Sequence, residues 1–430
     1  MAARGGNPFS QRTVQPAQGS LTTQESTSVQ VSASSRKRKP RPDALSDDSV
    51  DEGQVRTRQC GRRMPHFVHP YKSARDIVDE EYLARQRLRE LDAEEAENDE
   101  DEPTEQEIND MSSDEREALA AEWEREQHEK KLARRPAERA HDTYEALRKI
   151  VGPAVLDEKQ HTPGSDSTND FYAELDQGAC DARCHDTAKM TPIVGALVNA
   201  LVTDDDEKVS EQPGAANRSE RGLQHNITGY LMSCIQKDFS NPETKDAMRQ
   251  GKEDWAETCF VRVLYPQDGY DVDAVRKNFT QSPQMVAAFK TLFCSPTEAR
   301  AYITADENGP SPRKRRKVDV RGGPKRKSLA AKMSMEKVEP RCIAYTACQL
   351  HFALTDAKDW TTVYDGFNYA FFYDFIVDFF EGPQKTESRR QNVEDILDWW
   401  NEQIFPRGHC RARRGGDMIS KSAALLDEQD

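Results

Sequence analysis

Apolar residues are scarce in this 430-residue chain, and they are unevenly placed. Hydrophobic residues make up 36% of the sequence and charged residues 32%, against about 45–50% and about 25% in typical globular domains. The first 65 residues hold a single aromatic side chain, Phe9, whereas four of the five tryptophans follow residue 250. We therefore expect part of the chain to bury too little apolar surface to offset the entropy of ordering.

Long hydrophobic runs and a regular cysteine framework are also lacking. No apolar stretch is long enough to cross a bilayer and none lies near residue 1, so we expect neither a membrane span nor a signal peptide. The nine cysteines are odd in number and scattered. This pattern favours reduced thiols in the cytosol or nucleus over a set of disulfides.

Motifs that carry chemistry are missing as well, since neither a Walker motif nor Gly-x-Gly-x-x-Gly occurs. Cys180-x-x-x-Cys184-His185 offers metal-ligand types, but a structural zinc site needs a second pair of ligands at a suitable spacing. Cys294 and His351 could form a nucleophilic pair, yet a cysteine on an apolar helix is usually a core residue. We therefore predict no catalytic, cofactor-binding or metal-binding residues, and no cofactor.

Positive charge is concentrated in one place. From Ser311 to Lys332 ten Lys or Arg residues stand against one Asp, although the whole chain has a formal charge of −15. A second cluster occurs near the N-terminus. Such runs predict a nuclear-import signal or a polyanion-binding segment. The residues of the import signal are Arg313, Lys314, Arg315, Arg316, Lys317, Lys325, Arg326 and Lys327, and those of the second cluster are Arg36, Lys37, Arg38 and Lys39.

Negative charge is concentrated in residues 76–129, which carry 23 acidic and five basic residues. A loose apolar stripe predicts a first helix; it consists of Ile77, Leu83, Leu88 and Leu91. Ser112 followed by Glu115 forms a capping box that predicts the start of a second helix. Pro136 should end or kink that helix, and a further helix from about residue 137 should stop at Gly152-Pro153. Between the first two helices, residues 92–102 are expected to stay extended by self-repulsion.

The C-terminal half has the strongest helical patterns. Buried-type helices are predicted where apolar and aromatic residues cluster or recur at helical spacing, namely at 192–202, 283–293, 341–354, 367–380 and 393–405. Asn241-Pro242 predicts another helix start, and 271–279 also resembles a helix. Residues 259–265 alternate in polarity and predict a short strand or an extended segment. With no strand–helix alternation, the fold class is mostly α.

These patterns predict five parts, with the basic segment inside the fourth. The expected parts are a disordered segment (1–75), an acidic helical arm (76–153), a linker (154–186), a helical domain (187–406) with a disordered basic loop (306–332), and a disordered tail (407–430). The basic loop is unusually long for a compact domain, and such loops are usually functional or linkers.

Four stretches of the C-terminal half resemble an uncharacterised family of basidiomycete, mushroom-forming fungi, over roughly residues 187–406. They are the Gly222–Gly229 turn (GLQHNITG), the Pro283–Pro296 helix ending in Ser-Pro, the Cys342–Leu354 helix with Ile-Ala-Tyr, and Leu397–Pro406 with Trp-Trp-Asn. The resemblance implies a domain with no assigned function, and it supplies no catalytic residues.

The leading hypothesis is a nuclear, non-enzymatic interaction protein. Its basic loop would engage an import carrier, and its acidic arm would meet basic proteins. The alternatives are a DNA-associated factor that uses the basic loop for phosphate contacts, and an enzyme with an unrecognised site. The acidity of the folded segments weakens the nucleic-acid hypothesis, because DNA binding needs a basic face on a folded module. We expect no membrane partner.

Overall fold

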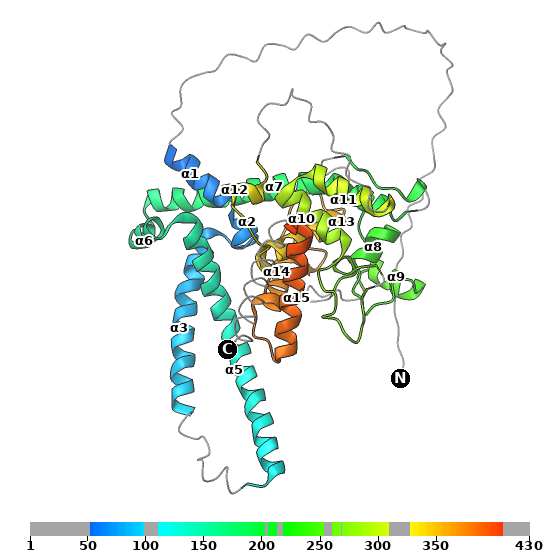
Figure 1. The fold of residues 1–430 in the computed structure, drawn as a ribbon. Coiled ribbons are helices and arrows are strands. Elements are labelled where there is room, and N and C mark those ends of the chain that lie inside the picture. Colours follow the sequence, from blue (N-terminus) through cyan, green and yellow to red (C-terminus); the bar gives the residue numbers. More distant parts are fainter. Residues whose placement is uncertain are drawn as a thin grey trace, which may run out of the picture. The chain divides into compact units, whose positions relative to one another are not determined.

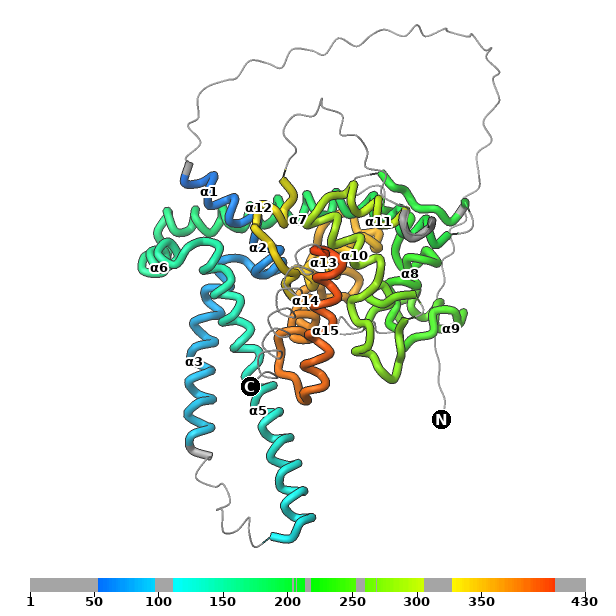
Figure 2. The backbone as a smooth tube through the Cα atoms, viewed as in Figure 1, coloured from blue at the N-terminus to red at the C-terminus, as the bar shows by residue number. Residues whose placement is uncertain are grey.

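The computed structural model describes residues 52–98, 111–202, 205–212, 218–252, 260–267, 269–308 and 327–406. These residues are mostly helical, as predicted (Figure 1; Figure 2). The α-helices are α1 (Glu52–Gly61), α2 (Met64–Phe67), α3 (Ala74–Asn98), α5 (Ser113–Val151), α6 (Pro153–His161), α7 (Asp166–Asn199), α8 (Asn226–Met232), α9 (Pro242–Arg249), α10 (Pro283–Phe289), α11 (Pro296–Asn308), α12 (Leu329–Lys332), α13 (Pro340–Leu354), α14 (Tyr369–Glu381) and α15 (Glu387–Ile404).

Shorter elements complete the described part of the fold. They include two 3-10 turns, η2 (Asp205–Glu207) and η4 (Arg262–Leu264). A π-helical turn, η5 (Lys290–Cys294), directly follows α10. Strands β1 (Val363–Tyr364) and β2 (Phe367–Asn368) pair antiparallel, with Tyr364 opposite Phe367. Asp365 and Gly366 between them both have positive φ, as a tight two-residue hairpin turn requires.

Residues 52–75 are folded, whereas the sequence predicted disorder up to residue 75. Met64 and Val68 are fully buried in a small core formed with α3, α5, α6 and α7. The α1 helix packs along α7, and Gly61 lies so close that a Cβ there would meet the Leu175 carbonyl oxygen at 2.1 Å. These helices are too short and too polar to be stable alone, so their order depends on α7.

The α3 and α5 helices pack together as a helical hairpin, which is drawn in blue and cyan (Figure 1). The capping box of Ser112 and Glu115 is confirmed. The expected apolar stripe on α3 is wrong at Leu83, which is 63% exposed, because Ala84 takes the buried position. The α3 helix also continues to Asn98, where the sequence predicted an extended chain.

The α5 helix runs through Pro136 to Val151, so the expected end at this proline is wrong, and residues 137–151 belong to the same helix. Proline lacks the backbone N–H for the bond to residue i−4, so neighbouring contacts must hold this turn. Arg135 and Arg139, on either side of the proline, both bind carboxylates of α14. The predicted end at Gly152-Pro153 is confirmed, with Gly152 at φ 102°.

Residues 154–186, predicted as a linker, are instead mostly helical. The α7 helix is 34 residues long and crosses the boundary that the sequence placed between residues 186 and 187. Its buried side chains recur every three or four positions, as in a helix packed on one side: Tyr172, Leu175, Ala179, Ala182 and Asp186. Most are small or partly polar, which explains why the apolar pattern was weak.

The largest core surrounds α13, all but one of whose residues are buried. Helices α7, α8, α10 and α14 contact it. Trp400 of α15 is fully buried, and its Nε1 donates to Thr280 Oγ1 at 3.3 Å.

Residues 271–279 form turns rather than the predicted helix. The ring of Phe279, at the end of this segment, packs against the ring of Phe379 in α14, and the two ring centroids lie 4.5 Å apart.

Residues 259–265 do not form a regular strand in the part that is described. Val261 makes one antiparallel bridge to Cys234, and residues 262–264 then turn as η4. No helix among the residues of known placement is long and apolar enough to cross a membrane.

His351 of α13 should make stability depend on pH. Its ring stacks on Phe367 at 4.4 Å and Nδ1 pairs with the Tyr369 hydroxyl at 2.9 Å. Burial lowers the pKa of His351 to about 3, against about 6.5 in an unfolded chain. At pH values between about 3 and about 6.5, His351 therefore binds a proton in the unfolded chain but stays neutral in the folded protein. The free energy of unfolding should therefore fall by about 1.4 kcal/mol for each pH unit below about 6.5.

Urea unfolding of the full chain from about pH 7 to about pH 4.5 measures this slope. We expect the slope to be smaller for His351→Phe, which keeps a ring but cannot titrate. His161→Phe, at an exposed histidine, should keep the slope of the unchanged protein. Equal slopes for His351→Phe and the unchanged chain would contradict the assignment.

Candidate functional site: an acidic helical hairpin and the groove at its base

The predicted import signal lies almost wholly outside the described residues, as does the second basic cluster at 36–39. The exception is Lys327, which is exposed just before α12. The described elements on either side of the basic segment both pack on the same core. Ala299 of α11 and Ala330 of α12 are buried, and both helices contact η5. The two ends of the basic segment are therefore held by one domain.

The distal half of the α3–α5 hairpin is strongly acidic and solvated. Residues 113–129 of α5 contain seven acidic and two basic residues, and residues 87–98 of α3 contain five and two. From residue 112 to residue 126 every side chain is exposed except the half-buried Leu119. Trp123 is 53% exposed in this stretch. We call residues 87–98 and 113–129 the acidic tip.

A few ion pairs lie within the acidic tip and just below it. Arg125 contacts Glu122 at 3.2 Å, one helical turn away, and Arg87 contacts Glu90 at 3.1 Å. Arg134 joins the two helices by pairing with Asp92 at 2.7 Å. Exposed pairs of this kind contribute less than about 1 kcal/mol each. The negative charge of the tip therefore remains available to an external partner.

The base of the hairpin is fixed to α14 of the C-terminal helical domain by buried and half-buried charges. Arg135 Nε donates to Asp378 Oδ1 at 2.8 Å, and its guanidinium is also within 3.6 Å of Glu381. Arg139 binds Asp378 and lies 3.4 Å from Asp374. Asp374, Asp378 and Glu381 are spaced four and three residues apart, so they lie on one face of α14. Arg135 is only 6% exposed.

Two further residues complete this buried network. Arg341 of α13 contacts both oxygens of Glu381 at 3.4 Å and donates to the Val68 carbonyl at 2.9 Å. The Nδ1 of His69 accepts from the backbone N–H groups of residues 71 and 72, so its Nε2 carries the proton and faces Asp374 at 3.3 Å. Burial lowers the pKa of His69. Burial opposes ionisation of Asp374, but the bond from His69 and the nearby Arg139 hold its pKa below the ordinary value.

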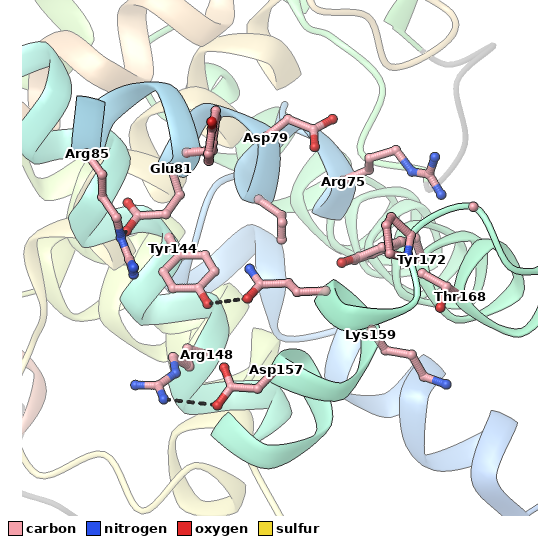
Figure 3. A pocket seen from close by; sticks show the side chains of 15 residues that line it. Arg75, Asp79, Glu81, Arg85, Tyr144, Arg148, Asp157, Lys159, Thr168 and Tyr172 are labelled. Carbon is pink, nitrogen blue, oxygen red and sulfur yellow. Dashed lines mark hydrogen bonds and ion pairs between the residues drawn. The ribbon is translucent and has the colours of Figure 1, made fainter. Parts of the chain in front are cut away.

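A groove of about 580 Å³ lies at the base of the hairpin, between α3, α5, α6 and α7 (Figure 3). Charges of both signs line it: Arg75, Arg85, Arg148 and Lys159 are cationic, and Asp79, Glu81 and Asp157 are acidic. The close-up shows the dashed bonds from the Tyr144 hydroxyl to Gln160 and from Arg148 to Asp157, both 3.4 Å long.

The charged groups of the groove are largely occupied by one another. Glu81 is 3% exposed and accepts from Arg85, while His141 lies 3.0 Å from the same carboxylate. Burial raises the pKa of the two lining phenols, Tyr144 and Tyr172. Their phenols therefore keep their protons at neutral pH. Arg75 and Asp79 lie outside the pairs within the lining, so they are charges that a charged segment could meet.

The other candidate residues are not brought together. Cys180 and Cys184 are exposed one turn apart on α7, and among the described residues no group of three potential ligands could hold a metal ion. Burial raises the pKa of Cys294 to about 11. Its possible partner His351 faces Phe367 and Tyr369 on α13.

The Gly222–Gly229 turn, one of the stretches that carry the family resemblance, stabilises the fold through its own hydrogen bonds and packing. Gly222 has φ 89° and donates to the Leu354 carbonyl at 2.9 Å. His225 caps α8 through Nδ1 and contacts the Glu207 carbonyl through Nε2 at 2.7 Å. Thr228 Oγ1 donates to the Gly222 carbonyl at 2.7 Å. A Cβ at Gly229 would meet Phe239 at 2.7 Å. These contacts hold the Gly222–Gly229 turn together and attach it to the C-terminus of α13.

Two buried arginines next to this turn terminate α13. Arg221 donates to the Ala353 carbonyl at 2.7 Å and to the Thr191 and Ser210 carbonyls at 3.0 and 2.7 Å. Arg218 donates to the Phe352 carbonyl at 3.2 Å and stacks on the Phe352 ring at 4.6 Å. Cations at a helix C-terminus satisfy its free carbonyls and its dipole. Burial lowers the pKa of Arg221 to about 10.

The fold and these sites define a mostly helical protein in which an acidic hairpin is joined to a helical domain by buried charges. Residues 177–405, more than half of the chain, match the model of a family described as "Family of unknown function (DUF6698)", and the chain belongs to this family. The match begins inside α7, so the hairpin lies outside it. No curated protein and no solved structure matched the chain.

Sequence reasoning missed the charge network, although part of its signal is visible. Arg135 and Arg139 are four residues apart, as are Asp374 and Asp378, so each pair lies on one helix face. The network then requires pairing across more than 200 residues of chain, which no local pattern specifies. His69 and Arg341 carried no signal, since an isolated charge is normally solvent-exposed.

We expect Arg135→Ala to lower the free energy of unfolding by about 1.5–3 kcal/mol, because it removes the charge-assisted hydrogen bonds of a buried guanidinium, while Asp378 and Glu381 keep Arg139 and Arg341 as partners. Arg125→Ala, which removes an exposed pair on the same helix, should cost less than about 1 kcal/mol. Urea denaturation measures both values, and hydrogen exchange should show faster exchange in residues 137–151 of the first variant. Similar losses in the two variants would contradict the proposed anchoring role.

Proposed function

We propose that the chain is a nuclear, non-enzymatic interaction protein of a basidiomycete fungus, whose acidic tip binds basic segments of other proteins. The observation that carries this proposal is the exposed acidic tip on a hairpin with a fixed base. Twelve acidic and four basic residues lie in the described helices of the tip. A surface of one sign raises the local concentration and the association rate of partners of the opposite sign.

Two further features support binding of a protein segment rather than nucleic acid or a small molecule. The negative tip repels phosphate, which nucleic-acid binding must neutralise. Trp123 stands half-exposed among the carboxylates, where its ring can contact the aliphatic stem or the charged head of Lys or Arg. Acidic and aromatic side chains side by side suit a Lys- or Arg-rich peptide.

The fixed base gives this surface a defined position. If the hairpin were attached only by a flexible chain, partner binding would have to bear the entropy of ordering it. The pairs of Arg135 and Arg139 with α14 remove that cost before binding. The neighbouring groove, with its mixed charges, would extend the contact for a longer segment.

The binding experiment uses fluorescence anisotropy with a labelled Lys- and Arg-rich peptide and the full chain. We expect binding that weakens with added salt, because the charges are exposed. Replacing Glu117, Glu124 and Glu129 of the tip by Gln should weaken it about tenfold, since three exposed charge interactions contribute about 1–1.5 kcal/mol together.

The matched control changes net charge by the same amount elsewhere. Glu298, Glu336 and Glu394 are exposed on the family domain, and replacing them by Gln should leave the affinity nearly unchanged. Equal weakening in both triple variants would show an effect of net charge alone. In that case, or if the peptide does not bind at low salt, the acidic tip is not the binding surface.

Nuclear import rests on the basic residues at 313–317, 325–327 and 36–39. Changing them to Ala should retain a fluorescently labelled chain in the cytoplasm of a fungal cell, because an import carrier recognises the compact run of cations. Changing Lys385, Arg389 and Arg390, which are exposed on the domain, should not alter the distribution. Persistent nuclear accumulation of the first variant would refute the localisation.

A further inference from the structure

Arg262, in the family domain, is a buried cation that forms no ion pair with any residue the structure describes. Its side chain sits at the start of η4 and the residue is 6% exposed. Within the described ranges no carboxylate forms an ion pair with it. Arg262 does help to lower the pKa of Asp238, after the hydrogen bonds from Ser240, but only through space. An uncompensated buried charge is costly, so something else must stabilise this guanidinium.

Part of that stabilisation comes from rings and neutral acceptors. The guanidinium lies between the Tyr230 and Tyr270 rings, at 4.9 and 5.0 Å from their centroids, which is the geometry of a cation–π contact. Its Nε donates to Ser233 Oγ at 3.0 Å, and Nη2 donates to the Lys237 carbonyl. The remaining terminal nitrogen, Nη1, is buried and has no hydrogen-bond partner among the residues of known placement.

Arg262 lines a small cavity that contains a second unsatisfied polar group. The cavity has a volume of about 90 Å³ and is also lined by Tyr230, Tyr265, Tyr270 and Gln284. The Oε1 atom of Gln284 is also buried and accepts no hydrogen bond within the described part of the chain. Rotation of this carboxamide exchanges its oxygen for its NH₂ group, so Gln284 can offer a donor beside Arg262. A water molecule occupies about 30 Å³ in the liquid, so the space admits a group of three or four heavy atoms.

We propose that this cavity, which Tyr230 and Tyr270 also line, binds a carboxylate group that accepts hydrogen bonds from Arg262 Nη1 and the Gln284 amide. A guanidinium is the preferred partner of a planar carboxylate. The bound group supplies the missing negative charge in a desolvated setting, where a charge-assisted hydrogen bond is strongest.

The phenols fit the same ligand. Burial raises the pKa of Tyr230, and its hydrogen bond with Tyr270 adds to the shift, although Arg262 opposes it. This hydroxyl therefore stays protonated beside the cavity. The Tyr265 hydroxyl is already used, since it donates to the Val275 carbonyl at 2.6 Å. Apolar residues such as Leu231 and Ile227 cover the rest of the wall. This is the pattern of a small-molecule site, in which a few polar groups set orientation within an apolar lining.

The site lies inside the family match and is independent of the acidic tip. The carboxylate could belong to a small free acid or to the C-terminus or acidic side chain of a peptide. The chemistry is the same in both cases. The experiment therefore includes one arm for each source.

The test follows thermal unfolding of the full chain by circular dichroism while sodium acetate replaces sodium chloride at constant ionic strength. We expect a saturable rise in the melting temperature, because a ligand that binds only the folded state stabilises it. In Arg262→Met the apparent affinity for acetate should fall about tenfold or more, as expected for losing a charged hydrogen-bond donor. Tyr270→Phe should weaken it about threefold, because the Tyr270 hydroxyl is hydrogen-bonded to that of Tyr230 and orients it. This milder change preserves the ring if Arg262→Met fails to fold.

Arg276→Met is the matched control, because Arg276 also stacks on a ring, Phe379 at 4.3 Å, but does not line the cavity. It should keep the full acetate response. A second arm compares a short peptide that has a free C-terminal carboxylate with the same peptide amidated. Stabilisation by acetate alone identifies a small acid, and stronger stabilisation by the free-acid peptide identifies a peptide end. If acetate and chloride act equally, or Tyr270→Phe and Arg262→Met respond as the unchanged chain does, the cavity holds water and the proposal is wrong.

Discussion

The pairing of α5 with α14 determines how the N-terminal and C-terminal halves of this protein fit together. The α14 helix packs an aromatic side into the core and presents Asp374, Asp378 and Glu381 at its edge. Half-buried carboxylates that face a buried guanidinium need cations with good geometry. Arg135 and Arg139 come from the hairpin and Arg341 from α13, so this one network fixes the hairpin, holds α5 across Pro136 and joins α2 through the Val68 carbonyl.

The family domain is built around the termination of one buried helix. Because α13 is buried on every side, the free carbonyls at its C-terminus cannot bind water. Arg218, Arg221 and Gly222 bind them instead. The residues that carry the family resemblance are therefore largely occupied by the fold itself. A binding role in this domain has to be sought in side chains that still have free polar atoms, which is why Arg262 and Gln284 stand out.

Sequence patterns identified the elements whose burial is nearly complete and missed those held by specific partners. The helix at 341–354 was predictable because almost every residue in it is apolar or buried. The α7 helix was not, because its contact face uses Ala, Gly and Tyr among polar residues. The α1 and α2 helices depend on contacts with residues 100 or more positions away. One of these contacts is the pairing of His66 with Asp186 at 2.7 Å. No local pattern encodes such contacts. The acidic tip was predictable from composition alone, whereas the Arg262 cavity required the positions of four separate segments.

The two proposed binding surfaces should respond to solution conditions in different ways, because their charges are differently exposed. At the acidic tip many solvated carboxylates act together, and each contributes little, so a Debye length of about 8 Å at physiological salt already screens most of their long-range attraction. At Arg262 one desolvated cation acts at hydrogen-bond distance, where mobile ions cannot enter between the partners. Affinity at the tip should therefore follow ionic strength closely, while affinity in the cavity should follow the shape of the anion. This difference follows from burial alone, and it separates a surface that gathers many basic partners from a site that selects one chemical group.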